Sequence, residues 1–197
     1  GVIFIFLVDP SLLRSPQRWW KPLLALLIGL LPLLYIPLRA ASGARGASPD
    51  LGTMFHGYVA GGPADDHEGT RLEDAVARVR QGMRAMLRLG SAWYDVATQI
   101  KAVTEMGLDP RNFILCTDDC FARTLVQDGH INGVVRHAIA CGCDPLVALQ
   151  MATINTATHF GLEREIGSIT PGRRADVILT SDLVSLPIEV VYARGVL

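Results

Sequence analysis

The stretch Asn112-Phe-Ile-Leu-Cys-Thr-Asp-Asp119 determines the fold expected for this chain. Its apolar run from Phe113 to Cys116 has the length and flanking residues of a buried β-strand, and two adjacent carboxylates follow it. Side chains at the carboxyl end of a strand point into the ligand crevice of α/β enzymes. Asp118 and Asp119 are therefore the first candidates for a functional site.

A second polar cluster, Asp65-Asp-His-Glu68, lies upstream of this strand. It places three acids around His67 within four residues, and His67 precedes Asp118 by fifty-one positions. A histidine can bind a metal or orient a water molecule, and a carboxylate such as Asp118 can bind a metal and transfer a proton. Taken alone, a structural capping or turn role explains both residues equally well.

Two helices are expected between the clusters. The first begins at Thr70, where Glu73 can complete a capping box, and it ends at Gly90. The second runs from about Ser91 to Met106 and ends at Gly107. Their apolar faces are expected to contain Leu72, Val76, Val79, Met83 and Met86 in the first helix and Trp93, Val96, Ile100 and Val103 in the second. This order of elements predicts an α/β fold with a parallel sheet.

The chain after Asp119 is expected to continue with helices and to end with strands. Helices are predicted up to Gln127, over Ile131–Ala140, and from Asp144-Pro145 to Phe160, the last with an acidic N-cap and a proline at its first position. The pattern then changes to period two. It predicts a strand, a turn at Pro171-Gly172 and a second strand, followed by a hairpin over Ile188–Leu197 that turns at Arg194-Gly195.

The first 39 residues differ in composition from the rest. Gly1–Val8 is almost entirely apolar and has no initiator methionine, which indicates that the chain starts inside a longer sequence. Pro22–Leu38 carries no charge and is flanked by Trp, Lys and Arg, so we expect an N-terminal apolar helix that spans a membrane through residues 19–39. A signal peptide or a buried soluble helix explains this segment less well. The segment resembles a piece of a polytopic membrane protein, and residues 40–57 are expected to form a linker.

Composition excludes some partners. The net charge is −1, with 18 basic and 19 acidic residues, so nucleic-acid binding is not expected. The four cysteines have spacings that match no common zinc motif, and we interpret them as mostly buried thiols of a reducing compartment: Cys116, Cys120, Cys141 and Cys143.

Five stretches carry a family resemblance: Tyr58-Val-Ala-Gly-Gly-Pro-Ala-Asp-Asp-His-Glu68, Leu115-Cys-Thr-Asp-Asp119, Asp128-Gly-His-Ile-Asn132, Met151-Ala-Thr-Ile-Asn155 with His159-Phe-Gly-Leu162, and Gly167-Ser-Ile-Thr-Pro-Gly-Arg-Arg-Ala-Asp176. Through them, residues 58–197 resemble the C-terminal part of the bacterial adenine deaminases of the amidohydrolase superfamily. The last stretch matches a pattern that is general to the superfamily. The first two stretches resemble adenine deaminases more specifically.

The resemblance implies a partial TIM-like amidohydrolase barrel over residues 58–160 and, over residues 161–197, C-terminal strands of the flanking β-sandwich. It implies hydrolysis of adenine to hypoxanthine and ammonia in the cytoplasm, with manganese or iron, or alternatively zinc, as the divalent metal. By position, His67 and Asp118 would bind metal, Asp118 and Glu68 would be catalytic, and Asp119 would bind the substrate. Assembly into a homo-oligomer is left open.

The chain also departs from the family pattern. It contains no His-x-His pair, and His56 lacks the motif that surrounds the corresponding family histidine. A closed barrel needs about 200 residues or more, so we expect a truncated chain that does not assemble a two-metal site alone. The alternative is a membrane-anchored domain without activity, or an artefactual fusion of two unrelated pieces. The remaining histidines are expected to be packing or capping residues: His130, His137 and His159.

Overall fold

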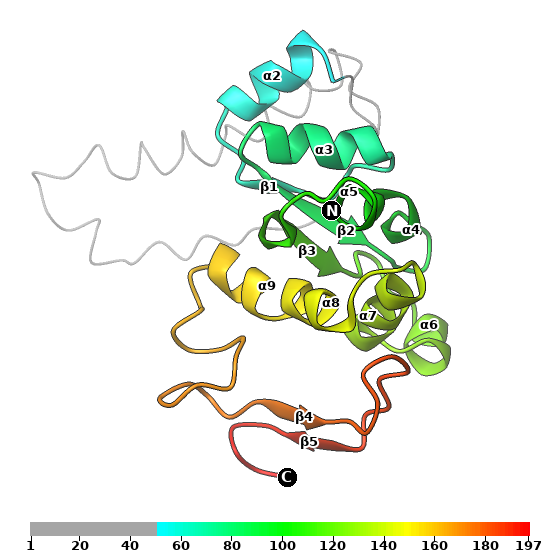
Figure 1. The fold of residues 1–197 in the computed structure, drawn as a ribbon, viewed down its shortest axis with the longest axis vertical. Helices are drawn as coiled ribbons and strands as arrows, with labels where there is room; N and C mark the ends of the chain where they lie inside the picture. Colours follow the sequence, from blue (N-terminus) through cyan, green and yellow to red (C-terminus); the bar gives the residue numbers. More distant parts are fainter. Residues whose placement is uncertain (1–50) are drawn as a thin grey trace, which may run out of the picture. The chain divides into compact units, whose positions relative to one another are not determined.

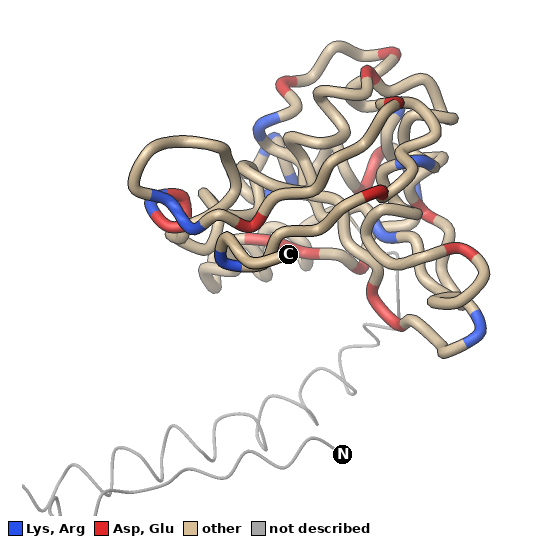
Figure 2. The backbone as a smooth tube through the Cα atoms, turned by 90° about the horizontal axis from the view of Figure 1, so that it is seen from below, with Lys and Arg blue, Asp and Glu red and all other residues tan. Residues whose placement is uncertain are grey.

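The structure is a computed structural model that describes residues 51–197. The expected membrane segment over residues 19–39 lies outside this range, as does the linker up to residue 50. Within residues 51–197, no helix is both long and apolar enough to cross a bilayer. Acidic and basic residues are interspersed over the same range (Figure 2).

A three-stranded parallel sheet forms the centre of the described part (Figure 1). Its strands are β1 (Asp65–Asp66), β2 (Arg84–Arg88) and β3 (Phe113–Cys116), in the order β1-β2-β3. Helix α3 (Leu72–Arg80) connects β1 to β2, and the short helices α4 (Val96–Gln99) and α5 (Lys101–Thr104) connect β2 to β3. This arrangement confirms the predicted α/β fold with a parallel sheet.

The first predicted helix is correct only up to Arg80. Gly82 has a φ of 82°, a left-handed conformation that ends the helix, and the chain then enters β2. The buried residues Met83, Ala85 and Leu87 alternate, as the core face of a strand requires. The predicted cap is also wrong, because Asp74, and not Glu73, accepts hydrogen bonds from the backbone of Thr70 and Arg71 at 3.1 and 3.0 Å.

The second predicted helix is shorter than expected. Residues 91–95 form a loop, and Trp93 is 41% exposed instead of lying on a buried helix face. The loop is closed by backbone hydrogen bonds from Gly90 to Trp93 and from Asp95 to Arg88. The predicted end at Gly107 is confirmed, since its φ is 68°.

The later helices follow the prediction more closely. They are α6 (Ala122–Gln127), α7 (Ile131–Ala140), α8 (Pro145–Ala152) and α9 (Ile154–His159). Asp144 caps α8 as expected, accepting from the amides of Leu146 and Val147. The single helix predicted from Pro145 to Phe160 is interrupted at Thr153, whose backbone is not helical and whose hydroxyl donates to the Leu149 carbonyl at 2.6 Å. An additional helix, α2 (Thr53–Ala60), includes residues for which composition predicted a linker.

The C-terminal region contains one antiparallel pair, β4 (Val177–Leu179) with β5 (Val190–Tyr192). The predicted turn at Arg194-Gly195 is confirmed, because both residues have a positive φ, of 53° and 77°. The strand predicted before Pro171 is wrong, since residues 166–170 are irregular. The apolar core lies against the sheet and is formed by β2, β3, α7 and α8, with Leu87, Phe113, Leu115, Val134 and Met151 among its buried residues.

Helix α9 lies against the amino ends of the strands. The Asn155 amide donates to the carbonyls of Pro110 and Phe113 at 2.8 and 3.0 Å. His159 Nε2 lies 2.6 Å from Asp65 Oδ2, at the start of β1, and its side chain is 8% exposed. His159 therefore connects α9 to the start of β1 through a polar pair, while its role as a packing or capping residue stays a prediction.

Replacing Asn155 with leucine, which has a similar size, should lower the free energy of unfolding by about 2 kcal/mol, because two backbone carbonyls lose their donor. Urea denaturation of the chain followed by circular dichroism measures this change. Thr158→Ala, at an exposed position of the same helix, is the control and should be close to neutral. Equal stability of Asn155→Leu and the control would show that the Asn155 hydrogen bonds do not stabilise the fold.

Candidate functional site

Arg88, the last residue of β2, organises the carboxyl edge of the sheet. Its side chain is 1% exposed, and its guanidinium contacts carboxylates from the three loops that follow the three strands. Nε donates to Asp95 Oδ2 at 2.6 Å, and Nη1 donates to Glu68 Oε2 at 3.2 Å and to Asp118 Oδ2 at 3.1 Å. Parallel pairing of Arg88 with Cys116 places it beside the end of β3, which explains its reach to Asp118.

Arg88 remains charged in this environment. Burial lowers the pKa of Arg88, but the hydrogen bond and the negative charge of Asp95, with smaller contributions from Glu68 and Asp118, outweigh burial and raise its pKa above the ordinary value. The Trp93 ring covers one face of the guanidinium, with its centroid 4.4 Å from Cζ. The site thus contains a permanent, shielded cation.

The backbone of Asp118 adopts an uncommon conformation. Its φ is 60°, in the left-handed region that few residues other than glycine adopt, and Asp tolerates it better than most. The side chain is 27% exposed. Oδ2 binds Arg88, and Oδ1 has no hydrogen-bond partner among residues 51–197. Asp118 therefore has one anchored oxygen and one oxygen available to a ligand.

The loops after β2 and β3 are packed directly against each other at Gly90. A Cβ atom at this position would collide with the backbone oxygens of Thr117 and Asp119, so only glycine fits. Ser91 N donates to the Asp119 carbonyl at 3.0 Å, and Ser91 Oγ accepts from Phe121 N at 2.8 Å. Asp119 Oδ1 is buried and has no partner among the described residues.

His67 and Glu68 lie on the other side of Arg88. His67 Nε2 is 3.7 Å from Glu68 Oε1, and the two side chains are 43% and 46% exposed. The Glu68 amide donates to Asp66 Oδ1 at 2.8 Å, and Arg78 holds the second oxygen of Asp66 at 2.6 Å. The structure thus joins Glu68 and Asp118 through Arg88 and places His67 beside Glu68.

The described residues supply only some of the side chains that a metal site needs. Among residues 51–197 there is no group of three or more His, Cys, Asp or Glu side chains arranged to hold a metal ion. His67 and Asp118 are two candidate donors, and one oxygen each of Glu68 and Asp118 is already bound to the guanidinium. The described residues therefore do not form a complete metal site.

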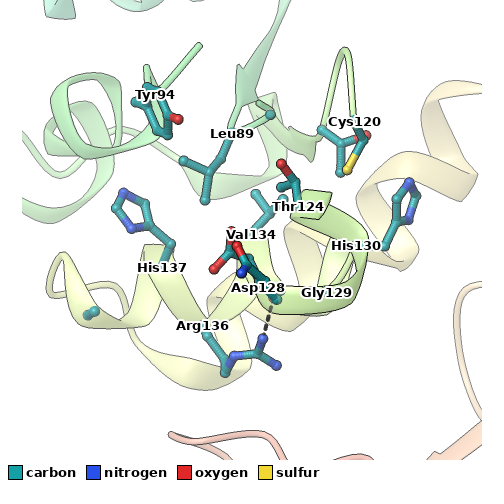
Figure 3. A pocket seen from close by; sticks show the side chains of 15 residues that line it. Leu89, Tyr94, Cys120, Thr124, Asp128, Gly129, His130, Val134, Arg136 and His137 are labelled. Atoms are coloured by element: carbon teal, nitrogen blue, oxygen red, sulfur yellow. Dashed lines mark hydrogen bonds between the residues drawn. The ribbon is translucent and has the colours of Figure 1, made fainter. Parts of the chain in front are cut away.

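A pocket of about 560 Å³ opens beside this edge, between the ends of β2 and β3 and helices α6 and α7 (Figure 3). Its lining side chains include Leu89 and Tyr94 from the loop after β2, Thr124 from α6, His130 just before α7 and His137 from α7. The four predicted site residues do not line it. Arg136, which does, donates to the Asp128 carbonyl at 2.6 Å.

Comparison with known proteins identifies the family. The model of the amidohydrolase family matches residues 78–197, which is more than half of the chain. The chain belongs to the amidohydrolase family.

The similar proteins narrow the comparison to one group within the family. The chain is 80% identical over 153 residues to an adenine deaminase of Ruegeria pomeroyi, an alignment that covers 78% of this chain and 25% of that protein. It is 51% identical over 139 residues to an adenine deaminase of Rubrobacter xylanophilus, covering 70% and 23%. This amidohydrolase chain thus spans about a quarter of the length of the relatives it matches. The resemblance to the C-terminal part of these enzymes is confirmed.

A solved structure supports the fold. The β-aspartyl dipeptidase of Fervidobacterium islandicum AW-1 superimposes with a TM-score of 0.50 over 64% of this chain and 35% of that chain, at 22% sequence identity. At this identity, the similarity concerns the fold alone.

The sequence did not predict five residues that shape the candidate site: Arg88, Gly90, Ser91, Trp93 and Asp95. Arg88 and Gly90 fell inside or at the end of a helix that does not extend so far, and Ser91 and Trp93 were assigned to the next helix. The alternation of buried residues between Met83 and Leu87 was the signal that could have identified β2. A strand at this position would have placed Arg88 at a carboxyl edge.

Substituting Gly90 by alanine should displace the loop that carries Asp118 and lower the free energy of unfolding by about 1–3 kcal/mol, because the new methyl group overlaps two backbone oxygens. Amide chemical shifts of residues 117–121 and urea denaturation measure both effects. Gly57→Ala in α2, where the added carbon meets open space, is the matched control. Unchanged shifts in Gly90→Ala would contradict the close approach.

The thiol at the end of β3 should be unreactive at neutral pH. Burial raises the pKa of Cys116 to about 12, and the negative charge of Asp118 contributes in the same direction. Because the thiol form persists below this pKa, iodoacetamide should leave Cys116 unmodified at pH 8 in the folded chain and modify it in urea. Peptide mass spectrometry measures the labelling, and rapid native labelling at pH 8 would show the prediction to be wrong.

Proposed function

We propose that this chain carries the C-terminal part of an adenine deaminase, an enzyme that hydrolyses adenine to hypoxanthine and ammonia. The observation that carries the proposal is the convergence of Glu68 and Asp118, from separate loops, on Arg88 at the carboxyl edge of the sheet. The high identity to adenine deaminases over most of the chain supports the choice of substrate. In barrel enzymes of this kind, the carboxyl edge is where the chemistry occurs.

Asp118 and Glu68 are the proposed proton-transferring groups. Replacing the amino group of adenine by oxygen requires that water lose a proton and that the departing amine gain one. Asp118 can do this because Oδ2 is anchored on Arg88 while Oδ1 is available. Glu68 is similarly anchored through Oε2, and its Oε1 faces His67. We assign Asp119, adjacent to this pair, to contact with the adenine base.

His67 and Asp118 are the proposed contribution of this chain to a divalent metal site, with manganese or iron, or alternatively zinc, as the ion. A bound metal of this kind supplies hydroxide at neutral pH by lowering the pKa of its water from about 16 to about 7. Because residues 51–197 do not complete a ligand set, the remaining donors must come from outside them.

The proposed location is the cytoplasm. All four cysteines are free thiols, which supports a reducing compartment, since oxidising compartments favour disulfides. None of the four lies in an arrangement that would bind a metal among the described residues.

The function is tested by grafting. The segment of the Ruegeria pomeroyi adenine deaminase that matches this chain is replaced by the corresponding residues of this chain, and ammonia release from adenine is measured with added Mn²⁺. The graft should be active, and Asp118→Ala should lower kcat/KM by about 100-fold or more, the usual size of an acid–base contribution. Glu105→Ala, at an exposed acid on the same chain, should leave activity unchanged.

Two results would count against the proposal. A folded graft without turnover would show that this chain cannot supply the deaminase segment. An active graft in which Asp118→Ala and Glu105→Ala have the same kcat/KM would show that Asp118 takes no part in the reaction. The family assignment would be unaffected. The same assay on the 197-residue chain alone measures how much activity it has without the rest of the relative.

A further inference from the structure

We propose that Ser91 is a positioning residue for Asp118, acting through a one-residue bulge in the chain that follows β3. The inference rests on the proposed deaminase function, in which Asp118 transfers protons. Ser91 acts on the backbone that carries this carboxylate and not on the substrate, through two hydrogen bonds with the loop after β3.

The hydrogen-bond ladder between β2 and β3 continues past the ends of both strands, but with one residue too many on the β3 side. Leu89 N donates to the Cys116 carbonyl at 3.0 Å, as the parallel register of the two strands requires. In a regular parallel ladder, the next donor, Ser91 N, would bond to the carbonyl of Asp118. It donates instead to the Asp119 carbonyl, also at 3.0 Å. The segment from Cys116 to Asp119 therefore contains a β-bulge.

Asp118 accommodates the extra residue. Its φ of 60° is the left-handed conformation that some bulges require, and its carbonyl, which the ladder bypasses, accepts from the Thr117 hydroxyl at 3.4 Å. Bulges next to active sites re-aim a side chain, and here Asp118 Oδ2 lies 3.1 Å from Arg88 Nη1. A left-handed backbone is unfavourable for a residue with a side chain, so contacts from neighbouring segments must hold it.

Ser91 supplies contacts that close the bulge. Its amide donates to the Asp119 carbonyl, and its hydroxyl accepts from Phe121 N at 2.8 Å. A single residue thus binds the loop at two points directly beyond Asp118. The hydroxyl also lies 2.8 Å from Thr124 Oγ1, which connects the first turn of α6 to the same point.

Gly90, the residue before Ser91, allows the close approach but cannot hold it. An added Cβ at Gly90 would collide with the backbone oxygens of Thr117 and Asp119, so the two segments are in direct contact. Glycine has no side chain that could bind the loop. The hydroxyl of Ser91 is the group that does so.

The first test uses the 197-residue chain and compares Ser91→Ala with Ser181→Ala, the same substitution at an exposed position after β4. Only Ser91→Ala should accelerate hydrogen exchange of the Phe121 amide, by about five-fold, the size expected for one lost hydrogen bond. Only this variant should also change the ¹³Cγ chemical shift of Asp118, because the carboxylate moves relative to Arg88. Ser91→Thr, which keeps the hydroxyl, should retain both native values.

The second test uses the Ruegeria pomeroyi deaminase that carries this chain as a graft. Ser91→Ala should lower kcat for adenine by about ten-fold and leave KM within about two-fold, because misplacing a proton-transferring group affects the chemical step more than binding. Ser91→Thr should restore most of kcat. Ser181→Ala should match the unsubstituted graft in both constants.

Each outcome decides the proposal. Unchanged exchange at Phe121 and an unchanged Asp118 shift in Ser91→Ala would overturn it, as would equal changes in Ser181→Ala. An active graft in which Ser91→Ala raises KM without lowering kcat would also overturn it. An inactive graft would refute the deaminase function alone, and the Asp118 shift would then decide: a change in Ser91→Ala that Ser91→Thr reverses supports the positioning role, and no change overturns it.

Discussion

The buried guanidinium of Arg88 is the interaction on which the functional edge of this structure depends. A charge removed from water is costly unless it is paired and hydrogen-bonded. Here the partners come from three separate loops, through Glu68, Asp95 and Asp118. Satisfying one buried cation therefore determines how three strand ends are arranged, and the acids that serve the proposed chemistry are the same groups that compensate the charge.

The two edges of the sheet have different roles. At the amino ends of the strands, α9 contacts the sheet through Asn155, whose bond to the Phe113 carbonyl is buried, and through His159, which pairs with the partly exposed Asp65. At the carboxyl ends, the contacts with Arg88 leave Asp118 Oδ1 without a partner among residues 51–197 and leave the side chains of Glu68 and Asp118 partly exposed. This division matches the general arrangement of parallel α/β barrels, in which the amino ends of the strands contribute to stability and the carboxyl ends carry the site.

Local signals in the sequence predicted those elements whose pattern is unambiguous. The short apolar run of β3, the acid and proline that begin α8, and the turn at Arg194-Gly195 each have one physical interpretation. The segment from Thr70 to Gly90 has two, because Val79, Met83 and Met86 fit a helical spacing while Met83, Ala85 and Leu87 fit a strand. The left-handed conformation of Gly82, an exposed residue, ends the helix and decides between them, and periodicity of the apolar residues does not describe it.

The sequence predicted some residues of the candidate site but not the contacts between them. Polar groups after strand ends made His67, Glu68, Asp118 and Asp119 the candidates. Their grouping depends on the register that sets Arg88 beside Cys116, and register is a relation between strands that no single segment contains. Arg88 was not predicted because the helical interpretation of residues 70–90 hid the strand that it ends, and because arginine is usually a surface residue.

The sheet and the candidate site are incomplete at the same places. Among residues 51–197, β1 and β3 each pair with β2 alone, so each presents one edge without a strand partner. Closed barrels leave no such edge. Glu68 follows β1 and Asp118 follows β3, so each of these acids lies next to one of the two edges. A parallel strand that paired with either edge would therefore end beside one of these carboxylates.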